Sequence, residues 1–238
     1  MLLKKTNFNR SNMSRNHVTY LNRLESMASN CDLKQFYLWP RTPVKDHMQE
    51  EIIQRTGVSD FDLSQGHSRP RQIISLIGTL LNEGSIGREF SILDFPCGDA
   101  IVLWQIKKSF PQANCYGLDC NKGVYTTHEM VQREGVLLYR AFLQDLFIND
   151  PVEPFDLALM LNTYRGWRSA GLRASEENLP KLADSWFGRN TRFAVITATD
   201  IQVSCLIDLG FSAIEIGKGE DNSKMICISR SPLPKPRA

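Results

Sequence analysis

The chain has 238 residues and a formal net charge of +2, and 42% of its residues are hydrophobic. This length suits one domain, or one domain with an extra lobe, and so much apolar material argues against a disordered chain. The net charge is far weaker than that of a dedicated nucleic-acid-binding domain, so bulk charge says little about partners, and the scattered basic residues disfavour a nucleic-acid partner. No apolar run approaches the roughly 18 residues that a membrane span needs, and we therefore expect a cytoplasmic protein that does not bind membranes.

The six cysteines form no C-x-x-C pair, and no histidine cluster has the spacing of a zinc site. Most of them lie in or beside apolar runs. This pattern predicts reduced, mostly buried thiols and no metal site.

The N-terminal part of the chain divides into two zones. Residues 1–16 are basic and rich in Asn and Ser, which predicts a flexible leader, with an organelle transit peptide as the alternative. Residues 17–87 read as largely helical, and we expect them to form a helical cap or substrate lid. Within this zone, helical spacing of apolar residues predicts helices at Val44–Gly57 and Arg69–Asn82.

Residues 88–238 have a different texture, in which short apolar runs alternate with helical stretches. This alternation predicts an α/β domain with a doubly wound, mostly parallel sheet and helices on both faces. The final two runs are joined by a turn sequence, which predicts a closing hairpin with an antiparallel strand. The expected strands are 90–95, 115–119, 137–142, 155–161, 192–199, 212–219 and 224–230, and the expected helices are 100–110, 123–135, 178–187 and 201–210.

A loop of small and acidic residues follows the first of these strands, at the sheet edge where such folds bind ligands. Small residues let a ligand approach the backbone, and the next helix offers free N–H groups at its start. Asp94 can accept hydrogen bonds from a cation or from loop amides, although it could instead merely cap the helix. The candidate cofactor-binding residues of this loop are Asp94, Pro96, Cys97, Gly98, Asp99 and Ala100.

Acidic residues also follow the second and third strands. Asp119 ends the second strand, beside Cys120, and a carboxylate there can bind both hydroxyls of a ribose. Gln144, Asp145 and Leu146 follow the third strand, where a carboxylate can accept from an exocyclic amine such as that of adenine. Both aspartates could instead be ordinary turn or cap residues.

Polar and aromatic residues follow the fourth strand, in the run from Asn162 to Trp167. A second substrate could meet the first ligand there, and a packed loop is the alternative. Just before the predicted helix at residues 69–82, His67 is a candidate general base, and Arg71, in the first turn of that helix, is a candidate ligand for a carboxylate. Solvated surface charge is the competing interpretation of these two residues.

The order and spacing of these features resemble the class I S-adenosylmethionine (SAM) dependent methyltransferases, which have a Rossmann-like fold. The loop of that family reads acid-x-Gly-x-Gly-x-Gly. The corresponding residues here are Asp94, Pro96, Gly98 and Ala100, with Pro and Ala at the outer glycine positions. The resemblance covers about Phe90 to Arg230 and includes the acids after strands two and three and the terminal hairpin.

The resemblance implies SAM as cofactor and S-adenosylhomocysteine as product. It implies that Gly98 and its neighbours contact the methionine part of SAM and that Asp119 binds the ribose hydroxyls. Asp145, with Gln144 and Leu146, would frame the adenine. Asn162 would line the methyl-transfer position, and the N-terminal helical zone would be the substrate cap.

We therefore expect a SAM-dependent methyltransferase acting on a small molecule, with oxygen methylation of a sugar or polyol favoured by the polar loop after the fourth strand. Methyl transfer depends mainly on alignment, and the candidate catalytic residues are Asn162, Tyr164, Arg165 and His67. Nitrogen methylation, methylation of nucleic acid or protein, and a non-catalytic Rossmann-like binding protein are alternatives. An NAD-linked oxidoreductase is disfavoured, because no G-x-G-x-x-G motif follows the first predicted strand. The oligomeric state stays open, with a homodimer as one option.

Overall fold

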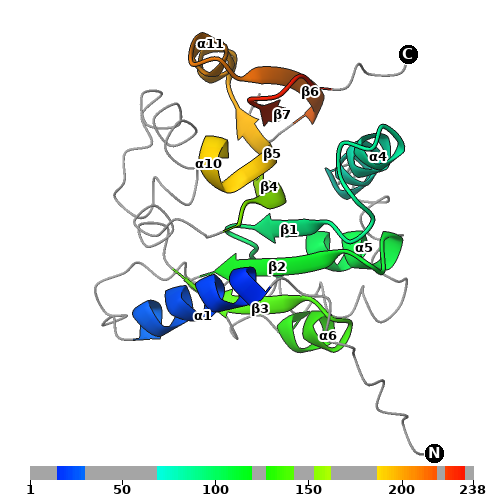
Figure 1. The fold of residues 1–238 in the computed structure, drawn as a ribbon, viewed down its shortest axis with the longest axis vertical. Coiled ribbons are helices and arrows are strands. Elements are labelled where there is room, and N and C mark those ends of the chain that lie inside the picture. The colour runs from blue at the N-terminus through cyan, green and yellow to red at the C-terminus, as the bar shows by residue number, and fades with distance from the viewer. Residues whose placement is uncertain are drawn as a thin grey trace, which may run out of the picture.

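The computed structural model describes residues 15–29, 69–119, 127–141, 153–161, 187–218 and 223–233. These residues form a central sheet with helices on both of its faces (Figure 1). The strands are β1 (Ser91–Asp94), β2 (Asn114–Asp119), β3 (Leu137–Arg140), β4 (Phe155–Met160), β5 (Thr191–Ala198), β6 (Ser212–Lys218) and β7 (Lys224–Ser229). The helices are α1 (Arg15–Ser29), α4 (Arg69–Asn82), α5 (Ile101–Ser109), α6 (Thr127–Arg133), α10 (Gly188–Asn190) and α11 (Asp200–Asp208).

The seven described strands follow the order β3-β2-β1-β4-β5-β7-β6. Strands β1 to β5 are parallel, and β7 runs antiparallel to both β5 and β6. This arrangement confirms the predicted doubly wound, mostly parallel sheet with a closing hairpin. The second strand of the hairpin, β7, pairs with β5. The first strand, β6, pairs only with β7 among the described strands and forms the edge of the sheet.

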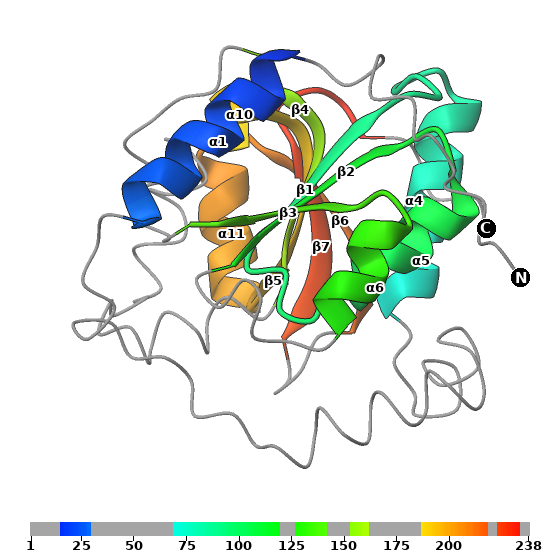
Figure 2. The ribbon, with the colours of Figure 1, turned by 90° about the horizontal axis from the view of Figure 1, so that it is seen from below.

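The core consists of two apolar layers, one on each face of the sheet. Helices α4, α5 and α6 cover one face, and α1, α10 and α11 cover the other (Figure 2). Successive residues of a strand point to opposite faces. In β1, for example, Ile92 packs into the layer beneath α4 and α5, whereas Leu93 packs into the layer beneath α1. Because both faces are buried, the central strands read as continuous apolar runs in the sequence.

The described helices of the predicted cap zone pack directly on the sheet. Helix α4 has the predicted bounds, Arg69–Asn82, and buries its apolar stripe in the first layer. Helix α1 begins at Arg15, two residues inside the predicted leader, and buries Tyr20, Leu21 and Leu24 in the second layer. The predicted helix at Val44–Gly57 and residues 178–186 lie outside the described residues, so the lid role of the N-terminal zone stays a prediction.

None of the helices that the structure describes is both long and apolar enough to cross a bilayer. The described cysteines are free: Cys97, Cys115 and Cys227 are buried, and Cys205 is half-buried. Burial raises the pKa of the Cys115 and Cys227 thiols to about 12, so both are protonated at neutral pH.

Gly117, in the middle of β2, is required by close packing. A Cβ atom there would lie 2.6 Å from Leu138 Cδ2, 2.9 Å from Cys97 Sγ and 3.1 Å from Leu103 Cδ1. The missing side chain lets the loop after β1 and the first turns of α5 approach the sheet. Sequence analysis did not single out this glycine, because its neighbours come from three separate elements.

We predict that Gly117→Ala lowers the free energy of unfolding by about 1–3 kcal/mol, the usual cost of overpacking a core. The matched control is Gly78→Ala in α4, where a Cβ would meet no atom of the described residues within 4 Å. An alanine inside a helix is favoured over glycine by about 1 kcal/mol, so this variant should be as stable as the wild type or more so. Urea unfolding measures both changes. Equal stability of Gly117→Ala and the wild type would contradict the packing described here.

Candidate functional site

The carboxyl ends of β1 and β2 lie side by side and place two buried carboxylates at one edge of the sheet. Asp94 ends β1 and pairs in register with Gly117, two residues before Asp119 ends β2. Asp94 and Asp119 are each only 4% exposed. The loop of residues 95–100 leaves β1 at this point and leads into α5.

Backbone hydrogen bonds tie this loop to the strands on either side of β1. The Phe95 N–H donates to the carbonyl of Leu159 in β4, and the Cys97 N–H donates to the carbonyl of Leu118 in β2, both at 2.9 Å. The Ala100 N–H then closes a turn onto the Cys97 carbonyl at 2.8 Å. The loop is therefore a fixed part of the sheet edge.

Two residues of the loop take the left-handed backbone conformation. Gly98 has a φ of 52° and Ala100 a φ of 61°. Glycine adopts this conformation without a steric cost, whereas alanine loses roughly 1–2 kcal/mol there. Ala100 occupies an outer glycine position of the family pattern. The backbone at Ala100 therefore has a conformation that favours glycine, although the residue there is alanine.

The side chain of Asp119 and the start of α6 hold the loop from the other side. The Gly98 N–H donates to Asp119 Oδ2 at 2.9 Å. Thr127 Oγ1 donates to the Asp99 carbonyl at 2.8 Å, and His128 Nε2 lies 2.7 Å from the Gly98 carbonyl. Because a carbonyl can only accept, His128 Nε2 must carry the hydrogen in this contact.

Thr127 and His128 were not among the predicted site residues. Both are buried, at 5% and 3% exposure, on the inner side of α6. The only signal in the sequence was a pair of polar residues at the start of the helix that follows β2. A polar pair of this kind is also common on exposed helices, so nothing in the sequence connected it to a loop some 30 residues earlier.

The carboxyl of Asp94 is electrostatically perturbed at this edge. Burial raises the pKa of its carboxyl well above the usual range, and the nearby carboxylates of Asp99 and Asp119 raise it further. Asp99 Oδ1 accepts from the Ile101 N–H at 3.2 Å, and Asp119 accepts from Gly98, but no donor within the described part of the chain reaches the Asp94 carboxylate. A cation bound beside Asp94 would favour the ionised form of this buried carboxyl.

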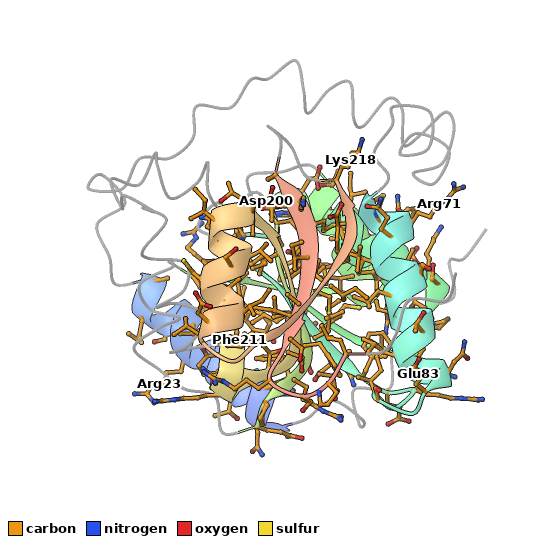
Figure 3. All side chains as sticks on the ribbon, turned by 90° about the horizontal axis from the view of Figure 1, so that it is seen from above. Arg23, Arg71, Glu83, Asp200, Phe211 and Lys218 are labelled. Atoms are coloured by element: carbon orange, nitrogen blue, oxygen red, sulfur yellow. The ribbon has the colours of Figure 1, made fainter. Side chains whose placement is uncertain are left out.

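The remaining described candidates differ in their positions. Pro96 is half-buried in the loop, and Cys97 is buried with its sulfur directed at Gly117. Arg71 is exposed near the start of α4, at the same end of the molecule as Asp200 and Lys218 (Figure 3). Its neighbour Gln72 packs against Gly217 in the edge strand β6, and the role of Arg71 stays a prediction.

Several predicted site residues lie outside the described residues, and their roles stay predictions. All of them except His67 follow β2, β3 or β4, and these strands are parallel neighbours of β1 or of one another and so end at the same edge of the sheet. These residues are Cys120, Gln144, Asp145, Leu146, Asn162, Tyr164, Arg165 and His67.

No protein-family model and no curated protein matches the chain. The matches described below are solved structures. A crystal structure of WbdD aligns with a TM-score of 0.51 at 16% identity, over 67% of this chain. A second WbdD structure, described as a bifunctional kinase-methyltransferase, also gives 0.51, at 14% identity.

The chain has the class I methyltransferase fold. It spans about 40% of the length of WbdD, so the similarity concerns one part of that larger protein. The pyocyanin biosynthetic protein PhzM aligns with a TM-score of 0.47 at 15% identity, over 76% of this chain and 61% of PhzM, which is too distant to support a conclusion. At these identities the likeness establishes the fold, and the chemistry has to be argued from the residues.

The raised pKa of Asp94 predicts a pH dependence of stability. Because the folded-state pKa lies above the unfolded value of about 3.9, the folded protein binds more protons between the two values, and Asp94 lowers stability as the pH rises through that window. We expect Asp94→Asn to remove this loss. Above about pH 4, the free energy of unfolding of the wild type should therefore fall with rising pH relative to that of the variant.

Chemical denaturation at a series of pH values measures this difference. Asp208→Asn, an exposed substitution at the end of α11, is the control and should keep the pH dependence of the wild type. Parallel curves for the wild type and Asp94→Asn would show that Asp94 is not a destabilising buried acid.

Proposed function

We propose that the protein is a SAM-dependent methyltransferase whose cofactor binds at the loop between β1 and α5. The observation that carries this proposal is the buried carboxylate of Asp94, which lacks a donor within the described part of the chain and lies near Asp99 and Asp119. SAM carries two positive centres, an ammonium and a sulfonium. A cationic cofactor bound here would stabilise the ionised form of the Asp94 carboxyl.

The space beside the loop supports the same proposal. Gly98 has no described atom within 4 Å of the position that a Cβ would occupy, so a ligand can approach its backbone. Asp119 lies one strand away, where a carboxylate can bind ribose hydroxyls in folds of this kind. The residues present thus fit both the methionine part and the ribose of SAM.

When bound, SAM supplies a methyl group on a sulfonium, which is already a good leaving group. The protein's own contribution is alignment of the acceptor with that methyl group. The hydrogen bonds from β2, β4 and α6 fix the loop, so that the groups which bind the cofactor are pre-organised. We assign Asn162, Tyr164, Arg165 and His67 to the acceptor side as proposals from the sequence.

We further propose a small-molecule acceptor, with oxygen methylation of a sugar or polyol favoured. The support is the polar and aromatic run from Asn162 to Trp167, which follows β4 at the same edge as Asp94. A non-catalytic binding protein is the second candidate, suggested by Pro96 and Ala100 at outer glycine positions. The left-handed backbone of Ala100 favours a working cofactor loop over a degraded one.

We predict that the protein binds SAM and S-adenosylhomocysteine and that Asp119→Asn weakens both at least tenfold, which corresponds to about 1.4 kcal/mol. Asparagine can still accept from the Gly98 N–H, so the loop should keep its position while the negative charge is lost. Isothermal titration calorimetry measures the affinities. Asp208→Asn serves as the control and should bind like the wild type.

The possible outcomes separate the parts of the proposal. Absence of binding to the wild type would reduce the methyltransferase proposal to a similarity of fold. Binding without turnover on a broad acceptor panel would favour the non-catalytic candidate. Methyl transfer to proteins or RNA alone would overturn the small-molecule acceptor and leave the cofactor assignment intact.

A further inference from the structure

A cavity of about 320 Å³ lies at the opposite edge of the sheet from the proposed cofactor loop. Pro154, just before β4, and Thr191, the first residue of β5, line it, so it faces the amino-terminal ends of these strands. The guanidinium of Arg230, which also lines it, stacks over the ring of Phe211. Figure 3 shows Phe211 and Glu83 at the end of the molecule opposite to Asp200 and Lys218.

Three arginines from separate elements converge on this cavity: Arg189 in α10, Arg192 in β5 and Arg230 just after β7. The chain as a whole is almost neutral, with 28 basic and 26 acidic residues. Three cations around one cavity are therefore a local concentration of charge and do not reflect the composition.

Two of the three arginines are held in place by the fold. Arg192 Nη1 lies 3.3 Å from Asp156 Oδ1. Arg230 Nη1 donates to the Leu209 carbonyl at 3.3 Å, and its guanidinium lies 4.5 Å from the centre of the Phe211 ring. Restricting these long side chains in advance reduces the entropy that a ligand would have to overcome.

The part of the lining contributed by described residues includes no carboxylate. Asp156 pairs with Arg192 and also accepts from the N–H and the hydroxyl of Ser91, at 2.9 and 3.1 Å. Arg189 is exposed and makes no hydrogen bond or ion pair with any other residue that the structure describes.

We propose that this cavity binds a small phosphate-bearing anion, such as a molecule with a diphosphate group. The planar fork of arginine matches the oxygens of a phosphate, and several forks converging on one volume suit a polyvalent anion. Ser85 and Ser231 line the same cavity and add hydroxyl donors. The volume lies at the lower end of the range of roughly 300–1,000 Å³ for small-molecule sites, which favours a compact ligand over a macromolecule.

Inorganic pyrophosphate is a suitable probe, titrated into the full-length protein at constant ionic strength and followed by calorimetry. We expect one site, and an affinity that falls at least fivefold in Arg189→Gln. This variant replaces an exposed side chain and should unfold like the wild type. Arg133→Gln, an exposed arginine of α6 that pairs with Glu129, is the matched control and should bind pyrophosphate like the wild type.

The proposal is overturned by the absence of pyrophosphate binding, by equal affinity of the wild type and Arg189→Gln, or by binding of an acidic polymer such as polyglutamate in place of pyrophosphate. Titration of Asp119→Asn separates this site from the cofactor loop. We expect its pyrophosphate affinity to equal that of the wild type, and pyrophosphate should not be displaced by S-adenosylhomocysteine. Displacement would place the anion at the loop after β1 and contradict a separate site.

Discussion

The hydrogen bond from the Gly98 N–H to the Asp119 carboxylate joins the end of β2 to the loop that leaves β1. The rest of the site depends on this link, because it fixes the loop beside a carboxylate that can itself bind a ligand. The Cys97 N–H reinforces the link through the Leu118 carbonyl, and Gly117 permits the close approach of Cys97 to the strand. One strand end therefore supports the loop and also belongs to the proposed binding surface.

This arrangement has a cost in stability. Asp94 is buried near two other carboxylates, and Ala100 holds a backbone conformation that glycine would adopt with less strain. Such features persist where a site needs them, since a binding site optimised for its ligand is often unfavourable without it. The two apolar layers and the continuous sheet supply the stability that allows this edge to remain strained and charged.

Much of the fold could be predicted from local patterns. Helix α4 has the predicted bounds, and the strands from β1 to β5 follow the apolar runs closely, because burial on both faces leaves a continuous signal. The position of β7 between β5 and β6 could not be predicted, since it depends on how a hairpin docks on a distant strand. Among site residues, Asp94 and Asp119 could be found from their positions at strand ends. Thr127 and His128 could not, because their role arises from a contact made only in the folded chain.

The central claim is that a cationic nucleoside cofactor binds at the loop between β1 and α5, and amide hydrogen exchange with and without SAM tests it most directly. The account predicts slower exchange for the amides of residues 97–103 and for the end of β2 when SAM is added, with no change at residues 189–193 on the opposite edge. Protection confined to other parts of the chain, or the same exchange with and without saturating SAM, would contradict it.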